Sequence, residues 1–199
     1  MNRFKIAFFS ILFFAIFIRF YQVTSFPPSL YWEEMALGYD AFSVLKTGKD
    51  HLGNPPPLVA FESYGDYKPA LYFYLLIPSI AVFGLNEFAV RFPTILAGIF
   101  IVIGVGVLTR LITEKYDPKR ARVFQLVAMA VTALSPWAIQ FSRAAWESNV
   151  ATCFIVFFKK KMVVSILWFL SFGTFNVYVS LSKSNCTTFG LRYDGPLAF

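Results

Sequence analysis

Hydrophobic runs separated by short polar segments dominate the chain. The runs 6–21 and 92–112 each approach the roughly 20 residues that a helix needs to cross the hydrocarbon core of a bilayer. Runs at 123–141, 144–158 and 162–181 predict three more spans, the second of which is short. The pattern therefore predicts an all-α integral membrane protein, a helical bundle with about five transmembrane helices.

The segment 22–90, between the first two predicted spans, has a different pattern. Its residues 69–84 are apolar, but the uninterrupted part is short and contains Pro78. Runs of 10–14 apolar residues are more often interfacial than spanning. We therefore expect a juxtamembrane helix here rather than another crossing.

Residues 33–46 predict a second, amphipathic helix in the same segment. Gly48 follows it, and glycine readily adopts the left-handed conformation that ends many helices. Apolar side chains recur on one face at helical spacing, namely Met35, Tyr39 and Phe42.

Composition and charge support a membrane location and give it an orientation. Of the 199 residues, 57% are hydrophobic and only 15% are charged, whereas soluble domains average about 25% charged residues. The net charge of +7 comes from basic clusters between apolar runs, a pattern typical of cytoplasmic loops, so nucleic-acid binding is not expected. Clusters within 3–5, 110–122 and 159–161 place the N-terminus in the cytoplasm and the segment 22–90 outside.

Both ends of the chain need an interpretation of their own. The basic start and apolar core of the first run also occur in signal peptides, which end in small residues. Here the run ends in Arg19, Phe20 and Tyr21, so we interpret it as a retained transmembrane helix. Residues 182–199 have no periodicity, and we expect an irregular tail after a single domain of residues 1–181.

Several familiar chemical sites are missing from the sequence. Cys153 and Cys186 offer no disulfide framework and no metal spacing, and we expect His51 to be a loop residue. No glycine-rich phosphate loop is present. The sequence indicates no definite cofactor, and it leaves open a divalent metal for which it offers no clear ligand set. Gly104 and Gly106 lie in a predicted span, where small residues allow helices to pack closely.

Two adjacent acids, Glu33 and Glu34, open the amphipathic helix and have two interpretations. Acids in a first helical turn are stabilised by the helix dipole by about 0.3–1 kcal/mol each, so they could simply mark a helix start. Alternatively, they could form an acid/base centre beside the membrane. The local pattern alone favours the helix start.

Three cations are expected near the same outer region. Lys68 precedes Pro69, which restricts it to an extended conformation, and Arg91 and Arg143 lie at the outer ends of predicted spans. Lys68 has an ordinary alternative, because lysine side chains often snorkel to the headgroup layer. Together the three cations could hold a phosphate group.

Four stretches within residues 19–158 carry a resemblance to a known family. They are YWEEMALGYDAFSVLKTGKD, GDYKPALYFYL, FGLNEFAVRFPTILAG and SPWAIQFSRAAWESN, in this order. The chain resembles the bacterial members of glycosyltransferase family 39, integral-membrane enzymes of the GT-C fold. These are related to protein O-mannosyltransferases and to the aminoarabinose transferase of lipid A. The family has a tryptophan and an acidic pair opening a helix, then a Lys-Pro-Pro-Leu-Tyr segment, then Asn-Glu followed by Arg.

The resemblance implies inverting transfer of a sugar from a polyprenyl-phosphate-linked donor to a protein or glycolipid acceptor, on the outer face of a bacterial plasma membrane. A carboxylate must accept the proton of the attacking hydroxyl, and cations must stabilise the leaving phosphate. By position, Glu33 matches the catalytic acid of the family and Glu34 its partner. Lys68 matches the lysine near the donor phosphate, while Arg91 and Arg143 match basic positions at outer helix ends.

The chain also departs from the family. Glu33 replaces the commoner aspartate, and Ala70 replaces the second proline. The resemblance fades after about Phe158, whereas family members have many more membrane helices. One hypothesis is a frameshift after Lys161, in a lysine run that an adenine tract could encode. An inactive N-terminal fragment is therefore one alternative to an active enzyme.

A non-catalytic membrane transporter or scaffold subunit is the alternative from another functional class. Transport favours ionisable residues in the middle of spans, where the predicted spans have almost none. The acids and bases gather on the outer side instead, and this location favours chemistry at the membrane surface.

The orientation gives a first test. A reporter fused after Gly53 should show that this position lies outside the cytoplasm, whereas the same reporter fused after Lys115 should show a cytoplasmic position. Paired alkaline phosphatase and fluorescent-protein fusions measure this directly. Equal signals at the two positions, or a reversed pattern, would contradict the predicted topology.

Overall fold

The computed structural model describes residues 3–56, 58, 60–63 and 66–157. The predicted span 162–181, the tail 182–199 and the proposed frameshift point lie outside the described residues.

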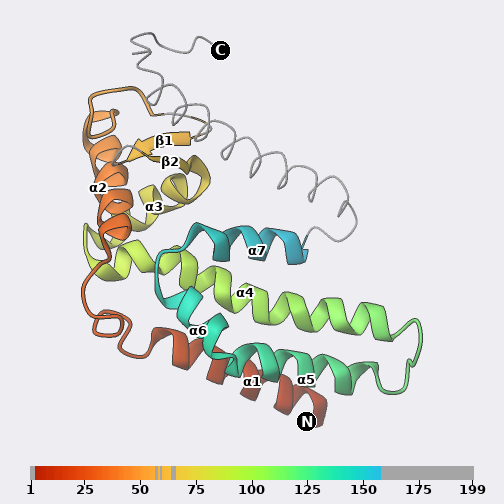
Figure 1. The fold of residues 1–199 in the computed structure, drawn as a ribbon. Coiled ribbons are helices and arrows are strands. Elements are labelled where there is room, and N and C mark those ends of the chain that lie inside the picture. The colour runs from red at the N-terminus through yellow and green to blue at the C-terminus, as the bar shows by residue number, and fades with distance from the viewer. Residues whose placement is uncertain (1–2, 57, 59, 64–65, 158–199) are drawn as a thin grey trace, which may run out of the picture.

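The described part of the chain is mostly helical, with seven α-helices and one short β-hairpin (Figure 1). In chain order the elements are α1 (Arg3–Phe20), α2 (Trp32–Thr47), β1 (Ala60–Ser63), β2 (Asp66–Pro69), α3 (Ala70–Phe83), α4 (Glu87–Thr113), α5 (Ala121–Leu134), α6 (Pro136–Arg143) and α7 (Glu147–Phe157).

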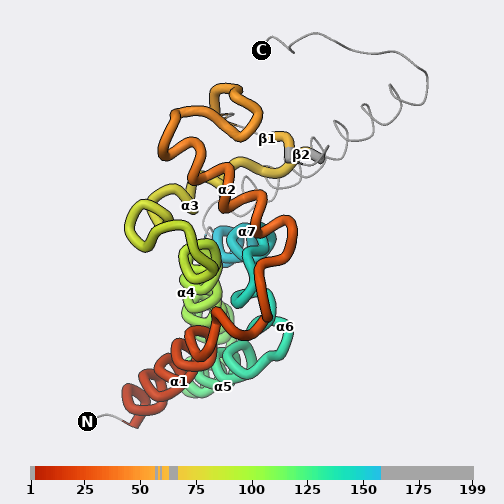
Figure 2. Tube along the Cα trace, turned by 90° about the vertical axis from the view of Figure 1, so that its left-hand side faces the viewer, coloured from red at the N-terminus to blue at the C-terminus, as the bar shows by residue number. Residues whose placement is uncertain are grey.

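Four helices, α1, α4, α5 and α7, run alongside one another, with α4 in contact with the other three (Figure 1). The start of α1 lies beside the start of α5, because the Arg122 guanidinium is 5.8 Å from the centre of the Phe4 ring. Two basic segments that the sequence assigns to the cytoplasm therefore lie at the same end of the bundle. Helices α2 and α3 and the hairpin gather at the opposite end, around the beginning of α4 (Figure 2).

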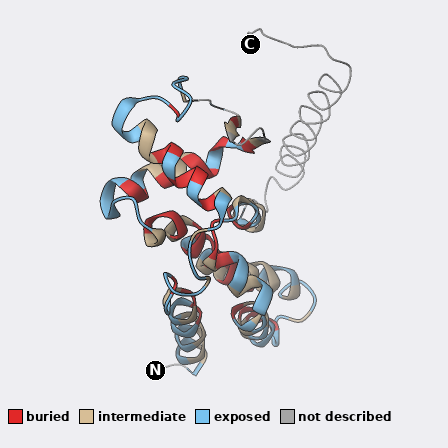
Figure 3. Cartoon of the chain, turned by 60° about the vertical axis from the view of Figure 1, so that its left-hand side comes forward, coloured by how far each residue is buried: buried red, intermediate tan, exposed pale blue. Residues whose placement is uncertain are grey.

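Buried residues concentrate where α2, α3 and the first half of α4 meet (Figure 3). Leu37, Phe73 and Val90 represent the three helices in this core, and each is almost fully buried. The outer faces of α1 and α5 instead expose large apolar side chains, among them Phe13, Phe17, Val127 and Val131.

Helix α4 is the one described helix that is long and apolar enough to cross a membrane. Its 27 residues give a length of about 40 Å. Helices α5 and α6 would qualify together, but they are bent by 58° at Ser135. Helices α3 and α7 are short, and α1 carries three cations among its 18 residues. Of the five predicted spans, the described residues therefore show one helix that is long and apolar enough to cross a membrane, or two if the bent pair counts as one span.

The break between α5 and α6 interrupts the predicted span 123–141. Proline lacks an N–H and disfavours a helical conformation in the residue before it. Ser135 accordingly has a ψ of 120°, and its side chain accepts a hydrogen bond from the backbone N–H of Ala138 at 3.5 Å. Pro136 thus ends one helix and begins the next.

The β-hairpin departs from the expected all-α fold. Strands β1 and β2 are antiparallel, with Phe61 opposite Lys68, so the extended conformation expected for Lys68 is confirmed. Phe61 is buried against Phe73, with ring centres 5.2 Å apart. Strands of four residues are too short for a period of two to be recognised in the sequence, and the hairpin depends on this tertiary contact.

Helix α2 confirms the predicted helix and its end, because Gly48 caps it with a φ of 72°. Its packed face is not the one formed by Met35 and Tyr39, which are about half exposed. The core contacts come from the Leu37 side of the helix. Gly38 allows this approach, because a Cβ added there would lie 2.8 Å from Cγ2 of Val90.

Glycines on α4 allow three other helices to approach closely. An added Cβ would lie 2.5 Å from Val156 of α7 at Gly104 and 2.3 Å from Met129 of α5 at Gly106, so both positions have the predicted packing role. Gly98 was not singled out in the sequence. There the added atom would lie 2.3 Å from Cβ of Ser142 on α6.

Gly98→Ala should destabilise the protein, because Cβ of Ser142 is fixed to the α6 backbone and cannot turn away. We expect a loss of about 1–3 kcal/mol, the usual cost of overpacking, measured by denaturant unfolding in detergent. Ser142→Gly removes the clashing atom and is the matched partner for a double-mutant cycle. The double variant should recover part of the loss, and strict additivity of the two single effects would contradict this packing.

Candidate active site

Glu33 and Lys68 form an ion pair at the centre of the site. Lys68 Nζ lies 2.6 Å from Glu33 Oε1, although the two residues are 35 positions apart in the chain. Glu33 is in the first turn of α2, and Lys68 is the residue before the proline that ends β2. The side chain of Lys68 is 7% exposed and that of Glu33 is 26% exposed. The carboxylate is therefore the more accessible partner.

Trp32 borders this ion pair. Lys68 Nζ lies 5.6 Å from the centre of the indole ring, within the range of a cation–π contact. Trp32 is itself 42% exposed. A carboxylate, an ammonium group and an exposed aromatic surface are thus adjacent at the start of α2.

Glu34 has surroundings quite different from those of its neighbour. Its side chain is buried, and both oxygens accept hydrogen bonds from Arg91, each at 3.2 Å. Backbone N–H groups complete the set, from Tyr31 at 2.9 Å and from Ala145 at 2.7 Å. With four donors around a buried carboxylate, Glu34 joins α2, α4 and the link between α6 and α7.

Arg91 is fully buried, and each of its five N–H donors has an acceptor. Two of them bind Glu34. The other three bind backbone carbonyls in the link between α1 and α2, those of Val23 at 2.6 Å, Pro27 at 3.0 Å and Ser29 at 2.5 Å. No donor of Arg91 is left for a phosphate group in this arrangement.

Arg143, at the end of α6, binds the last turn of α1 and the same link between α1 and α2. Its guanidinium donates to the carbonyls of Ile18 at 3.1 Å, Tyr21 at 2.8 Å, Gln22 at 3.2 Å and Phe26 at 2.7 Å. Figure 2 shows α6 lying beside this link.

The structure therefore separates the five residues that the sequence proposes for the site. Glu33 and Lys68 lie together, while Glu34, Arg91 and Arg143 hold the backbone around them. The two arginines do not join Lys68 in a three-cation phosphate site. The reason is the irregular segment between α1 and α2, whose carbonyl groups have no partners in a helix or sheet and take the arginine donors instead.

Tyr72 on α3 is a further polar group beside the buried acid. Its hydroxyl donates to the carbonyl of Val90 at 2.8 Å. Burial, and after it the negative charge of Glu34, raises the pKa of Tyr72 well above its ordinary value. The hydroxyl therefore stays protonated and serves as a donor.

The contact between Asp40 and His51 was not foreseen in the sequence. Asp40 is buried, and its Oδ1 lies 2.5 Å from His51 Nδ1 and 3.0 Å from the His51 backbone nitrogen. The pair fastens the loop after α2 to that helix, so His51 is a loop residue as predicted. No local sequence pattern predicts a contact between two residues eleven positions apart. The contact forms because the chain turns back after Gly48.

Among the described residues, no group of three or more His, Cys, Asp or Glu side chains is placed to hold a metal ion. Comparisons with protein-family models, curated proteins and solved structures found no match.

Neutralising the buried Glu34 should lower the free energy of unfolding far more than neutralising an exposed acid. Glu34→Gln should destabilise the protein by about 3–5 kcal/mol, because it leaves the buried Arg91 charge without its partner. Glu114→Gln is the matched control, since Glu114 pairs with Arg110 on an exposed helix face at 3.5 Å, and it should cost less than about 1 kcal/mol. Denaturant unfolding measures both. Equal costs would contradict a structural role for Glu34.

Proposed function

We propose that this protein is a multi-pass membrane glycosyltransferase with a GT-C-like helical bundle. It transfers a sugar from a polyprenyl-phosphate-linked monosaccharide to a protein or glycolipid acceptor on the outer face of the plasma membrane, with inversion at the anomeric carbon. The contact between Glu33 and Lys68 carries this proposal. The resemblance matches these two residues to the base and to the phosphate-binding lysine, and they are adjacent across 35 residues of chain.

The chemistry assigns one step to each residue. The acceptor oxygen attacks the anomeric carbon as the bond from that carbon to the phosphate oxygen breaks. Glu33 accepts the proton of the acceptor hydroxyl. The bonding electrons remain on the phosphate, and Lys68 stabilises its added negative charge. The phosphate competes with Glu33 for the ammonium, so donor binding frees the carboxylate to act as a base.

Glu34 and Arg91 serve the proposed reaction indirectly. Glu34 is the residue after the base, and its four hydrogen bonds fix the first turn of α2. Such support holds a reacting side chain in place without touching the substrate. We therefore assign the reaction to Glu33 and Lys68 and treat Glu34 and Arg91 as positioning residues.

Surface properties support the membrane location. Apolar side chains are exposed along α1 and α5, as expected for helices that face lipid, and α4 has the length of a span. The basic starts of α1 and α5 lie together, which fits a cytoplasmic N-terminus and a bundle that crosses the bilayer several times. The Glu33–Lys68 pair lies at the opposite end of the bundle, where a lipid-linked donor would present its phosphate.

The proposal is tested by transfer assays in membranes supplied with radiolabelled polyprenyl-phosphate sugars. Glu33→Gln should reduce the rate by at least about 100-fold, the lower range for loss of a general base, while Glu33→Asp retains a carboxylate and should keep part of the activity. Lys68→Met should also reduce the rate, because the leaving phosphate loses its cation.

Glu114→Gln is the control for these variants, because its exposed ion pair lies at the other end of α4. Unchanged transfer by Glu33→Gln would remove Glu33 as the base. If the unaltered chain transfers no sugar from any of several donors, the result favours the inactive fragment, the transporter or the scaffold subunit over an active enzyme.

A further inference from the structure

Five exposed aromatic residues lie in two groups that the structure holds together, Trp137, Phe141 and Trp146 in one and Tyr31 and Trp32 in the other, here called the aromatic strip. Each is between 38% and 74% exposed. Ring centres of consecutive members lie 6.3 Å apart for Trp137 and Phe141, 6.0 Å for Phe141 and Trp146, and 5.6 Å for Tyr31 and Trp32.

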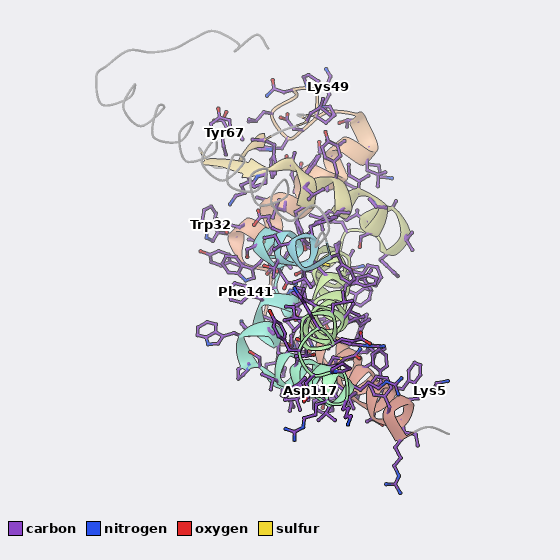
Figure 4. All side chains as sticks on the ribbon, turned by 90° about the vertical axis from the view of Figure 1, so that its right-hand side faces the viewer. Lys5, Trp32, Lys49, Tyr67, Asp117 and Phe141 are labelled. Carbon is purple, nitrogen blue, oxygen red and sulfur yellow. The ribbon has the colours of Figure 1, made fainter. Side chains whose placement is uncertain are left out.

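The carboxylate of Glu34 joins the two halves of the strip. It accepts the backbone N–H of Tyr31 on one oxygen and that of Ala145, the neighbour of Trp146, on the other. The start of α2 and the link between α6 and α7 are therefore held side by side. Figure 4 shows Trp32 and Phe141 projecting on the same side of the molecule.

Helix α6, which carries the first part of the strip, leaves the direction of the bundle. It turns by 58° from α5 and lies across the end of the bundle where α1 finishes (Figure 1). Trp137 and Phe141, one helical turn apart, are exposed, whereas Ser142 is fully buried against Gly98 of α4. Arg143 holds the end of α6 to the last turn of α1 and to the chain between α1 and α2, which fixes the direction of α6.

We infer that the aromatic strip lies in the headgroup layer of the outer leaflet, and that α6 is an interfacial helix rather than the last part of a span. Tryptophan and tyrosine concentrate at this depth because their rings are apolar with a polar edge. None of the five residues of the strip is charged. An exposed aromatic surface that continues directly from the apolar helix α5 fits lipid better than it fits water.

The inference rests on the membrane location in the proposed function and adds a depth to it. Trp32 ends the strip and lies over Lys68. Anchoring the strip therefore keeps the Glu33–Lys68 pair level with the headgroups. A lipid-linked phosphate could reach Lys68 while its hydrocarbon chain stays in the bilayer, and the acceptor would approach from the aqueous side.

Depth-dependent fluorescence quenching tests the inference on the full chain in phospholipid vesicles. Variants that keep Trp137 alone, with the other three tryptophans replaced by phenylalanine, are compared in lipids brominated near the glycerol or near the chain ends. Trp137 should be quenched more strongly by the shallow bromines than by the deep ones, and only weakly by iodide in the water. Phe100→Trp in a background without other tryptophans is the control, because Phe100 lies midway along α4.

The control separates the two proposals. If the tryptophan at position 100 is quenched by deep bromines and Trp137 by shallow ones, the inference stands. Strongest quenching of Trp137 by deep bromines would make α6 part of a span, and strongest quenching by iodide would make the strip a water-facing surface for another macromolecule. Either result overturns this inference and leaves the membrane location in the proposed function untouched. Absence of quenching of the tryptophan at position 100 by any brominated lipid would instead overturn the membrane location itself.

Discussion

The buried ion pair between Glu34 and Arg91 is the interaction on which the rest of the site depends. It connects the first turn of α2 to α4, and the remaining donors of Arg91 hold the irregular chain that leads into α2. Removing two charges from water costs several kcal/mol per ion, and their attraction offsets this cost only when the remaining donors and acceptors are also satisfied. Here all five donors of Arg91 are satisfied, so the charges position the backbone without an unpaired group.

This arrangement gives two adjacent acids two different roles. Successive residues of a helix point about 100° apart, so Glu34 faces the core while Glu33 faces Lys68 and the surface. The buried acid has four donors and no access to substrate, whereas the outer acid has one cationic partner and partial exposure. Glu34 is therefore a structural acid of the first helical turn, and Glu33 is the member of the pair that the proposed reaction could use.

Close packing along α4 brings the other helices to this region. Gly98, Gly104 and Gly106 allow α6, α7 and α5 to approach the helix backbone, and small residues have this role where apolar lipid provides no driving force for helix association. The same helix carries Arg91 near its beginning. One element thus supplies both the packing surface of the bundle and the residue that orders the loop above it.

The sequence by itself determined the helices α2, α3 and α4, the end of α2 at Gly48 and the extended conformation of Lys68, because these features follow from periodicity, glycine and proline over a few residues. Only the tertiary structure decided which charged groups meet. Lys68 reaches Glu33 through a hairpin that depends on the contact of Phe61 with Phe73. Arg91 and Arg143 bind carbonyls of the segment between α1 and α2, and no local sequence pattern predicts that these carbonyls lack partners in a helix or sheet. Local rules act over one or two turns of chain, whereas a buried charge takes its partner from whichever segment folds against it.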